Sequence, residues 1–244
     1  MKNIKLILEY DGTNYNGWQR QKNGVTIQQT LEKALSNLTS EDVKVEGCSR
    51  TDSGVHAKEY VANFKTNATI PPHCYREALK SRLPLDIVVT KSEEVEDDFH
   101  ARYCNIGKTY CYTILNRELP SALKRNYTYH VRKKLDIEAM KKACAYFIGK
   151  HDFSAFKSLG SSTTSSIRTI SDLHIETNED EINIFVTADG FLYNMVRIIV
   201  GTLIFVGTGK LKPEDMKDII DSKERKRAGR CVPPTGLSLE KVFY

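Results

Sequence analysis

The sequence predicts an α+β protein made of two tandem split β-α-β units, ferredoxin-like or RRM-like in layout, with antiparallel sheets flanking a central cleft. Three observations predict it. Strand and helix patterns follow one another as β-α-β-β-α-β through residues 3–95. The remainder repeats that order approximately, starting from a strand at 108–115. At 244 residues the chain is long enough for two units, which we place at 1–104 and 105–244.

The elements of the first unit have clear individual patterns. Residues 26–38 form a helix because their apolar side chains share one face, and Thr26 with Gln29 fits a capping box. A second helix begins at Pro71-Pro72 and ends at Pro84. Alternating or β-prone runs predict strands at 3–10, 43–49, 60–65 and 87–95. Such a sheet carries both helices on one face and leaves the other face open.

In the second unit, Asp136 is the expected N-cap of a helix, and the apolar run at 193–206 is expected to be a buried helix. The polar, Ser/Thr-rich residues 157–167 predict a mobile loop or a lid, between which the sequence does not choose. The helices are expected at 136–147, 193–206 and 213–221, and the strands at 108–115, 127–132, 167–176, 181–187 and 237–243.

The formal net charge of +5 suggests an anionic partner. Residues 223–230 form a local cationic cluster, Lys-Glu-Arg-Lys-Arg-Ala-Gly-Arg, for which a solvated face is the alternative. The six cysteines include no C-x-x-C pair, which argues against a zinc site and suits a reducing compartment. No apolar run reaches the ~20 residues needed to span a bilayer. We therefore expect a cytoplasmic protein with no membrane association.

The most reactive set of side chains lies between two expected strands, in the stretch from Arg50 to His56. One interpretation is an Asx-type turn in which Asp52 bonds backbone amides near Gly54 and Arg50 is a surface partner. The alternative is a carboxylate kept ionised by an adjacent cation and used as a nucleophile or base. Taken alone, the stretch favours the turn.

Arg197 is the only charged residue in an otherwise apolar helix. A buried charge needs an anionic partner, and the candidates are Asp189, just before the helix, and Asp52. The alternative is an exposed edge position with the side chain reaching water. An aspartate paired with two arginines would have a depressed pKa and be ionised at neutral pH, which favours a nucleophile.

The loop after the first strand carries Trp18 among amide and basic side chains. Such a loop can stack on bases and contact phosphates, or it can be anchored to the core by its aromatic residues.

Taken together, motifs along nearly the whole chain resemble the TruA family of tRNA pseudouridine synthases. They occur in the family's order, and each is weak alone. They are Tyr10-Asp11-Gly12-Thr13-Asn14-Tyr15-Asn16-Gly17-Trp18-Gln19, Arg50-Thr51-Asp52-Ser53-Gly54-Val55-His56-Ala57, Phe99-His100-Ala101-Arg102, Lys108-Thr109-Tyr110, His151-Asp152-Phe153-Ser154-Ala155-Phe156, Asp189-Gly190-Phe191-Leu192-Tyr193-Asn194-Met195-Val196-Arg197 and Pro233-Pro234-x-Gly236-Leu237-x-Leu239.

The resemblance implies an isomerase that converts uridine to pseudouridine at positions 38, 39 and 40 of the tRNA anticodon arm. It implies a homodimer that contacts tRNA with both subunits and needs no cofactor or metal. The base must leave the stack before its glycosidic bond can be broken. A sheet surface with aromatic and basic groups suits single-stranded RNA.

The resemblance also implies the site residues. Asp52 is the nucleophile and Arg197 pairs with it, while Arg50 supports the flipped-out state. Tyr110 stacks on the target base, with a role in proton transfer, and Leu237 lines the base pocket. As further substrate-binding residues we assign Trp18, Lys108 and Arg230, from the aromatic and basic loop, the Lys-Thr-Tyr motif and the cationic cluster.

The chain departs from the family pattern at several positions. Ser49 and Ser53 replace a usual Gly and Ala around the Arg-Thr-Asp motif, Lys58-Glu59-Tyr60 replaces a small apolar stretch, and Arg230-Cys231-Val232 replaces Pro-Thr-Ala. A divergent paralogue with a narrower or different RNA target is therefore one alternative. Two further alternatives are a non-catalytic RNA-binding module and a hydrolase that uses Asp52 with His56. The sequence lacks the RNP motif typical of the first, and it has no Ser or Cys in the context typical of the second.

Overall fold

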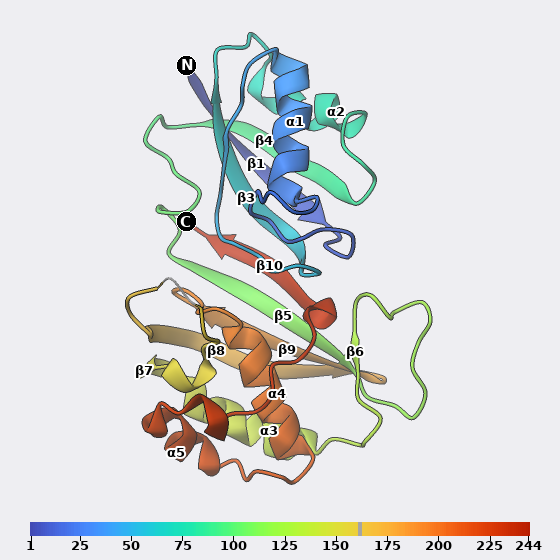
Figure 1. Ribbon diagram of the computed structural model, residues 1–244, viewed down its shortest axis with the longest axis vertical. Coiled ribbons are helices and arrows are strands. Elements are labelled where there is room, and N and C mark those ends of the chain that lie inside the picture. The colour runs from blue at the N-terminus through green and yellow to red at the C-terminus, as the bar shows by residue number, and fades with distance from the viewer. Residues whose placement is uncertain (161–162) are drawn as a thin grey trace. The chain divides into compact units, whose positions relative to one another are not determined.

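The computed structural model describes residues 1–160 and 163–244, which form two compact units (Figure 1). The first comprises Met1–Ile106 with Ser238–Tyr244, and the second comprises Gly107–Leu237. The change of unit lies close to the expected residue 104. The last strand differs from expectation, because it groups with the first unit instead of the second. We describe each unit by itself.

The first unit has the predicted split β-α-β layout, with strand order β4-β1-β3-β2 and antiparallel pairing throughout. The last strand, β10, adds to β3 in parallel, pairing Ser238 with His56 and Leu239 with Ala57. Since β10 follows the entire second unit in the sequence, local patterns could not assign it to this sheet. The strands are β1 Lys2–Tyr10, β2 Val45–Gly47, β3 His56–Thr66, β4 Ile87–Val95 and β10 Leu237–Phe243.

Two helices cover this sheet (Figure 1). Helix α1, Ile27–Thr39, begins where predicted, and its N-cap Thr26 accepts a hydrogen bond from the Gln29 amide at 3.3 Å. Its residues Ile27 and Leu31 are fully buried, as the apolar face predicts. The second helix is shorter than expected: a 3₁₀ turn at Pro72–Cys74 precedes α2, Tyr75–Lys80.

The second unit has an antiparallel sheet of order β5-β9-β8-β7, with β6 added in parallel to β5. The hairpin of β8 and β9 was predicted. Strand β7 was not predicted because its sequence, Gly-Lys-His-Asp, lacks any apolar alternation, and β6 is only two residues of the expected 127–132. The strands are β5 Gly107–Leu115, β6 Tyr129–His130, β7 Gly149–Asp152, β8 Ile167–Asn178 and β9 Glu181–Ala188.

Helix α3, Ile137–Cys144, is capped by Asp136, which accepts from the Ala139 amide at 2.9 Å, as predicted. Helix α4, Met195–Gly207, is the buried helix of this unit, and α5 spans Asp215–Ser222. Short 3₁₀ turns lie at Ala145–Phe147, Ser154–Phe156, Arg225–Arg227 and Pro234–Gly236. Of the loop predicted to be mobile or a lid, residues 161–162 lie outside the described residues.

The cationic segment at 223–230 is attached to α4 through its backbone. The Gly229 amide donates to Thr202 Oγ1 at 2.8 Å, and Arg225 donates to the Gly229 carbonyl at 2.8 Å. A Cβ on Gly201 would lie 1.8 Å from the Arg230 carbonyl oxygen, so only glycine permits this approach. The segment is therefore held in place while Lys226 and Arg227 stay exposed. In the described part of the chain, no helix is long and apolar enough to cross a membrane.

Candidate active site

Asp52 lies in the turn that joins β2 to β3, and it is half-buried. The Val55 amide donates to the Asp52 carbonyl at 3.2 Å, and Gly54 has a φ of 77°. A positive φ is accessible to glycine without strain. The stretch is thus a turn that the Asp52 main-chain carbonyl helps to close, and this geometry is compatible with the chemical interpretation, because the turn presents a carboxylate.

A loop at residues 11–18 fixes the backbone on both sides of Asp52. The Trp18 amide donates to the Thr51 carbonyl at 3.1 Å. Ser53 Oγ and the Gly54 amide donate to the Tyr15 carbonyl at 3.1 and 3.4 Å. These hydrogen bonds hold the turn on both sides of Asp52. Ser53 is one of the departures from the family pattern, and here its hydroxyl adds a bond to the loop.

Gly17 allows the loop to approach the turn closely. Its φ is 79°, and a Cβ there would lie 2.4 Å from the Thr51 carbonyl oxygen and 3.0 Å from the Asp52 carbonyl carbon. A side chain would be strained by that φ and would push the turn away.

On the chemical interpretation, in which Asp52 is the reactive carboxylate, we expect Gly17→Ala to lower kcat about tenfold and the free energy of unfolding by about 1–3 kcal/mol, because the strained turn moves and the carboxylate changes orientation. Steady-state kinetics and urea unfolding measure the two effects. Gly209→Ala is the matched control, since Gly209 also has a positive φ, 76°, but nothing lies within 4 Å of its Cβ position. An unchanged kcat in Gly17→Ala would contradict the role of the loop at residues 11–18 in holding the turn.

Trp18 is only 2% exposed, and its ring stacks on Tyr60 with centroids 4.1 Å apart. Tyr15 Oη donates to Asp86 Oδ1 at 2.5 Å, and burial, followed by this hydrogen bond, raises the pKa of Tyr15. These contacts favour the second interpretation of the loop, anchoring to the core by its aromatic residues. Tyr60, another departure, also donates to the Ser49 carbonyl, so two departures contact each other next to the turn.

His56 begins β3 and is buried. Its Nδ1 lies 3.1 Å from the Gly12 amide nitrogen and 3.1 Å from Asp11 Oδ1. The imidazole therefore contacts the start of the loop at residues 11–18, and this structural role differs from the base that the hydrolase alternative requires.

In the second unit, Tyr110 lies on β5, opposite Val186 of β9. Its ring meets Phe191 edge to face, with centroids 5.0 Å apart and planes at 83°. Lys108 is two residues earlier on the same strand, so its side chain shares the Tyr110 face of the sheet. Both residues are mostly buried, at 7% and 6% exposure.

Arg197 lies in the first turn of α4 and is half-buried. Its Nε donates to the Val232 carbonyl at 2.8 Å, and a terminal nitrogen donates to Asn194 Oδ1 at 2.6 Å. Asn194 is itself held by a bond from its amide to Ser158 Oγ at 2.9 Å. Two fixed acceptors therefore orient the guanidinium. Asp189, the local candidate partner, accepts from the Thr169 backbone amide at 3.0 Å.

The remaining predicted site residues differ in exposure. Arg50 is exposed beside the turn, whereas Leu237 is buried at the start of β10. Arg230 is exposed, donates to Tyr129 Oη and lies with its guanidinium carbon 5.7 Å from the centroid of that ring. Across residues 1–160 and 163–244, no group of three His, Cys, Asp or Glu side chains could hold a metal ion.

Comparison with known proteins gives one consistent result. A family model described as tRNA pseudouridine synthase matches residues 6–104 and 143–244. The chain is 65% identical to "tRNA pseudouridine synthase A 2" of Clostridium perfringens and 61% identical to "tRNA pseudouridine synthase A" of Clostridium botulinum, over all 244 residues and the full length of each relative. A protein of that second name in Thermoanaerobacter sp. is 57% identical over the same span.

Proposed function

Since the chain belongs to the tRNA pseudouridine synthase family, we propose that it converts uridine to pseudouridine at positions 38, 39 and 40 of the tRNA anticodon arm. The observation that carries this proposal is the full-length identity to relatives named tRNA pseudouridine synthase A. The enzyme is an isomerase. Its partner is tRNA, and we propose that it acts in the cytoplasm as a homodimer without a cofactor.

The reaction rearranges bonds without adding or removing atoms overall. The bond from N1 of uracil to C1′ of ribose breaks, the base turns, and a bond from C5 to C1′ forms. The hydrogen on C5 leaves as a proton, and N1 gains one. The target base must first leave the stack to expose these atoms. A carboxylate that attacks C6 of the base or C1′ of the ribose provides the covalent step.

We propose Asp52 as that nucleophile. The family motif supports it, as does the held turn, because a fixed backbone limits the positions that the carboxylate can take before attack. Arg197 is proposed to pair with Asp52, and its two acceptors favour one guanidinium orientation. Arg50, exposed beside the turn, is proposed to support the flipped-out state.

On the substrate side, we propose that Tyr110 stacks on the target base and takes part in proton transfer, and that Leu237 lines the base pocket. Stacking of a base on an aromatic ring contributes ~1–3 kcal/mol. Lys108 and Arg230 are proposed to bind the RNA electrostatically. The sequence also predicts substrate binding by Trp18, whereas its stacking on Tyr60 supports a role in holding the loop.

Release of tritium from tRNA labelled at C5 of uridine tests the reaction, because C5 loses its hydrogen only when the new carbon–carbon bond forms. We expect release that reaches at most three equivalents per tRNA. A transcript with cytidine at positions 38, 39 and 40 is the control and should release none. No release from the uridine transcript, by protein that binds it, would overturn the proposed function.

A further inference from the structure

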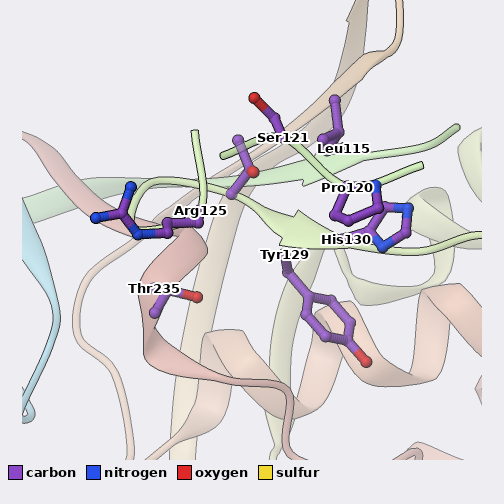
Figure 2. Close-up of a pocket in the computed structure, with 8 residues that line it drawn as sticks. Leu115, Pro120, Ser121, Arg125, Tyr129, His130 and Thr235 are labelled. Atoms are coloured by element: carbon purple, nitrogen blue, oxygen red, sulfur yellow. The ribbon is translucent and has the colours of Figure 1, made fainter. Parts of the chain in front are cut away.

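The second unit contains a pocket at the far end of β5 from Tyr110 (Figure 2). Its volume is about 260 Å³. Figure 2 shows Arg125 on one side and Pro120 with His130 on the other. Small-molecule sites typically have volumes of about 300–1,000 Å³, so this pocket suits a smaller group. It is lined by Leu115, Pro120, Ser121, Arg125, Thr128, Tyr129, His130 and Thr235.

The pocket wall is a loop, residues 116–128, that hydrogen bonds hold in place at both ends. Asn116 donates to the Val131 and Lys133 carbonyls at 2.7 and 2.9 Å. His130 Nε2 lies 2.8 Å from the Arg117 carbonyl oxygen. At the other end, β6 pairs with β5, and the Val131 amide donates to the Leu115 carbonyl at 2.9 Å. Because both ends are fixed, the pocket exists before a ligand arrives, which lowers the entropy cost of binding.

Several cations surround the pocket, and most are neutralised by a carboxylate. Lys124 pairs with Glu181 at 2.6 Å, Arg117 with Asp180 at 3.5 Å and Arg132 with Glu118 at 3.4 Å. Arg125 differs, since it forms no ion pair with any carboxylate of the described chain. A terminal nitrogen of its guanidinium donates to the Ala122 carbonyl at 2.5 Å.

Arg230 is the second cation without a carboxylate partner within the described residues. It donates to Tyr129 Oη and lies over the Tyr129 ring, which itself lines the pocket. The pocket therefore combines the Tyr129 ring, the Arg125 guanidinium and the Ser121 hydroxyl, and Arg230 lies next to it against the Tyr129 ring. Guanidinium and hydroxyl donors are the usual partners of nucleic-acid phosphates, and aromatic rings pack against unpaired nucleotides.

We propose that this pocket binds one phosphodiester-linked nucleotide of the RNA substrate, outside the reaction centre, with its phosphate at Arg125. The proposal rests on the proposed function. Leu115 is five residues along β5 from Tyr110, which corresponds to about 17 Å of strand. Consecutive nucleotides of a stacked RNA strand are about 3.4 Å apart along its axis, so the bound phosphate lies about five nucleotides from the isomerised uridine. The site thus fixes the register of the anticodon arm.

Arg125→Ala tests the site through affinity. We expect a KM for tRNA about five- to tenfold higher and a kcat within twofold of wild type. The logarithm of the binding constant for tRNA should also fall less steeply with the logarithm of the salt concentration, with a slope smaller by about 1. Arg125→Lys should keep most of the slope. Arg82→Ala is the matched control, because exposed Arg82 likewise donates to an alanine carbonyl, that of Ala78, in the first unit.

A methylphosphonate scan locates the contact. RNAs carrying one uncharged linkage each, four to six nucleotides from the target on either side, are titrated into wild type and Arg125→Ala. One linkage should weaken wild-type binding and leave Arg125→Ala unaffected. An Arg125→Ala protein with the KM and salt slope of Arg82→Ala, or one that loses kcat at saturating tRNA, would overturn the proposal. Failure of wild type to release tritium would instead reject the function.

Discussion

Asp52→Asn is expected to form no detectable pseudouridine, a loss of at least about 10⁴-fold in kcat. The amide has almost the shape of the carboxylate but is not a nucleophile. Main-chain groups hold the turn: the Val55 amide bonds to the Asp52 carbonyl, and the loop bonds to Thr51, Ser53 and Gly54, so the amide side chain leaves these contacts in place. The variant should therefore fold normally and bind tRNA.

Two measurements separate chemistry from folding in this variant. Filter binding should give a Kd for tRNA within about threefold of wild type, since one uncharged replacement leaves the phosphate contacts intact. Asp42→Asn is the matched control, because Asp42 is 84% exposed and pairs with Lys44. It should retain full activity. Wild-type turnover by Asp52→Asn would show that another group is the nucleophile.

Arg197→Ala is expected to lower kcat by about 10²–10³-fold, because the proposed partner carboxylate loses the cation that orients it. Asn194 and the Val232 carbonyl fix the guanidinium from two directions, so a shorter or more flexible cation should not replace it fully. Arg197→Lys should recover part of the activity. Single-turnover kinetics with saturating enzyme measure the chemical step directly.

A structural cause for that loss can be tested separately. Arg197 is one charged side chain in a helix of buried apolar residues, so its removal should lower the thermal midpoint by only a few degrees. Asn194→Ala should reproduce a smaller part of the kinetic loss, since it removes one of the two acceptors. Equal kcat for wild type and Arg197→Ala would remove Arg197 from the proposed site.

Much of the fold could be predicted because its elements have strong periodicity. The faces of α1 and the alternation in β1, β8 and β9 each occupy enough residues to identify the element. The short strands β6 and β7 could not be predicted, since two to four residues with polar side chains form strands only through their neighbours.

The proposed site could be predicted only at positions whose side-chain type belongs to a motif. The motifs identify Asp52, Tyr110 and Arg197 by their side-chain type. The supporting contacts are mainly backbone groups: the Tyr15 carbonyl under the turn and the Val232 carbonyl at Arg197. Any residue supplies a carbonyl, so no sequence signal marks these positions. Gly17 is a partial exception, because glycine in a loop suggests a positive φ or a close approach.

Position-resolved mapping of pseudouridine in tRNA transcripts, after incubation with wild-type or Asp52→Asn protein, tests the central claim most directly. The account predicts pseudouridine at positions 38, 39 and 40 with wild type, on transcripts that carry uridine there, and none with Asp52→Asn. Pseudouridine at only one or two of these positions would identify the narrower paralogue. Absence at all three with wild type, or equal modification by both proteins, would contradict the account.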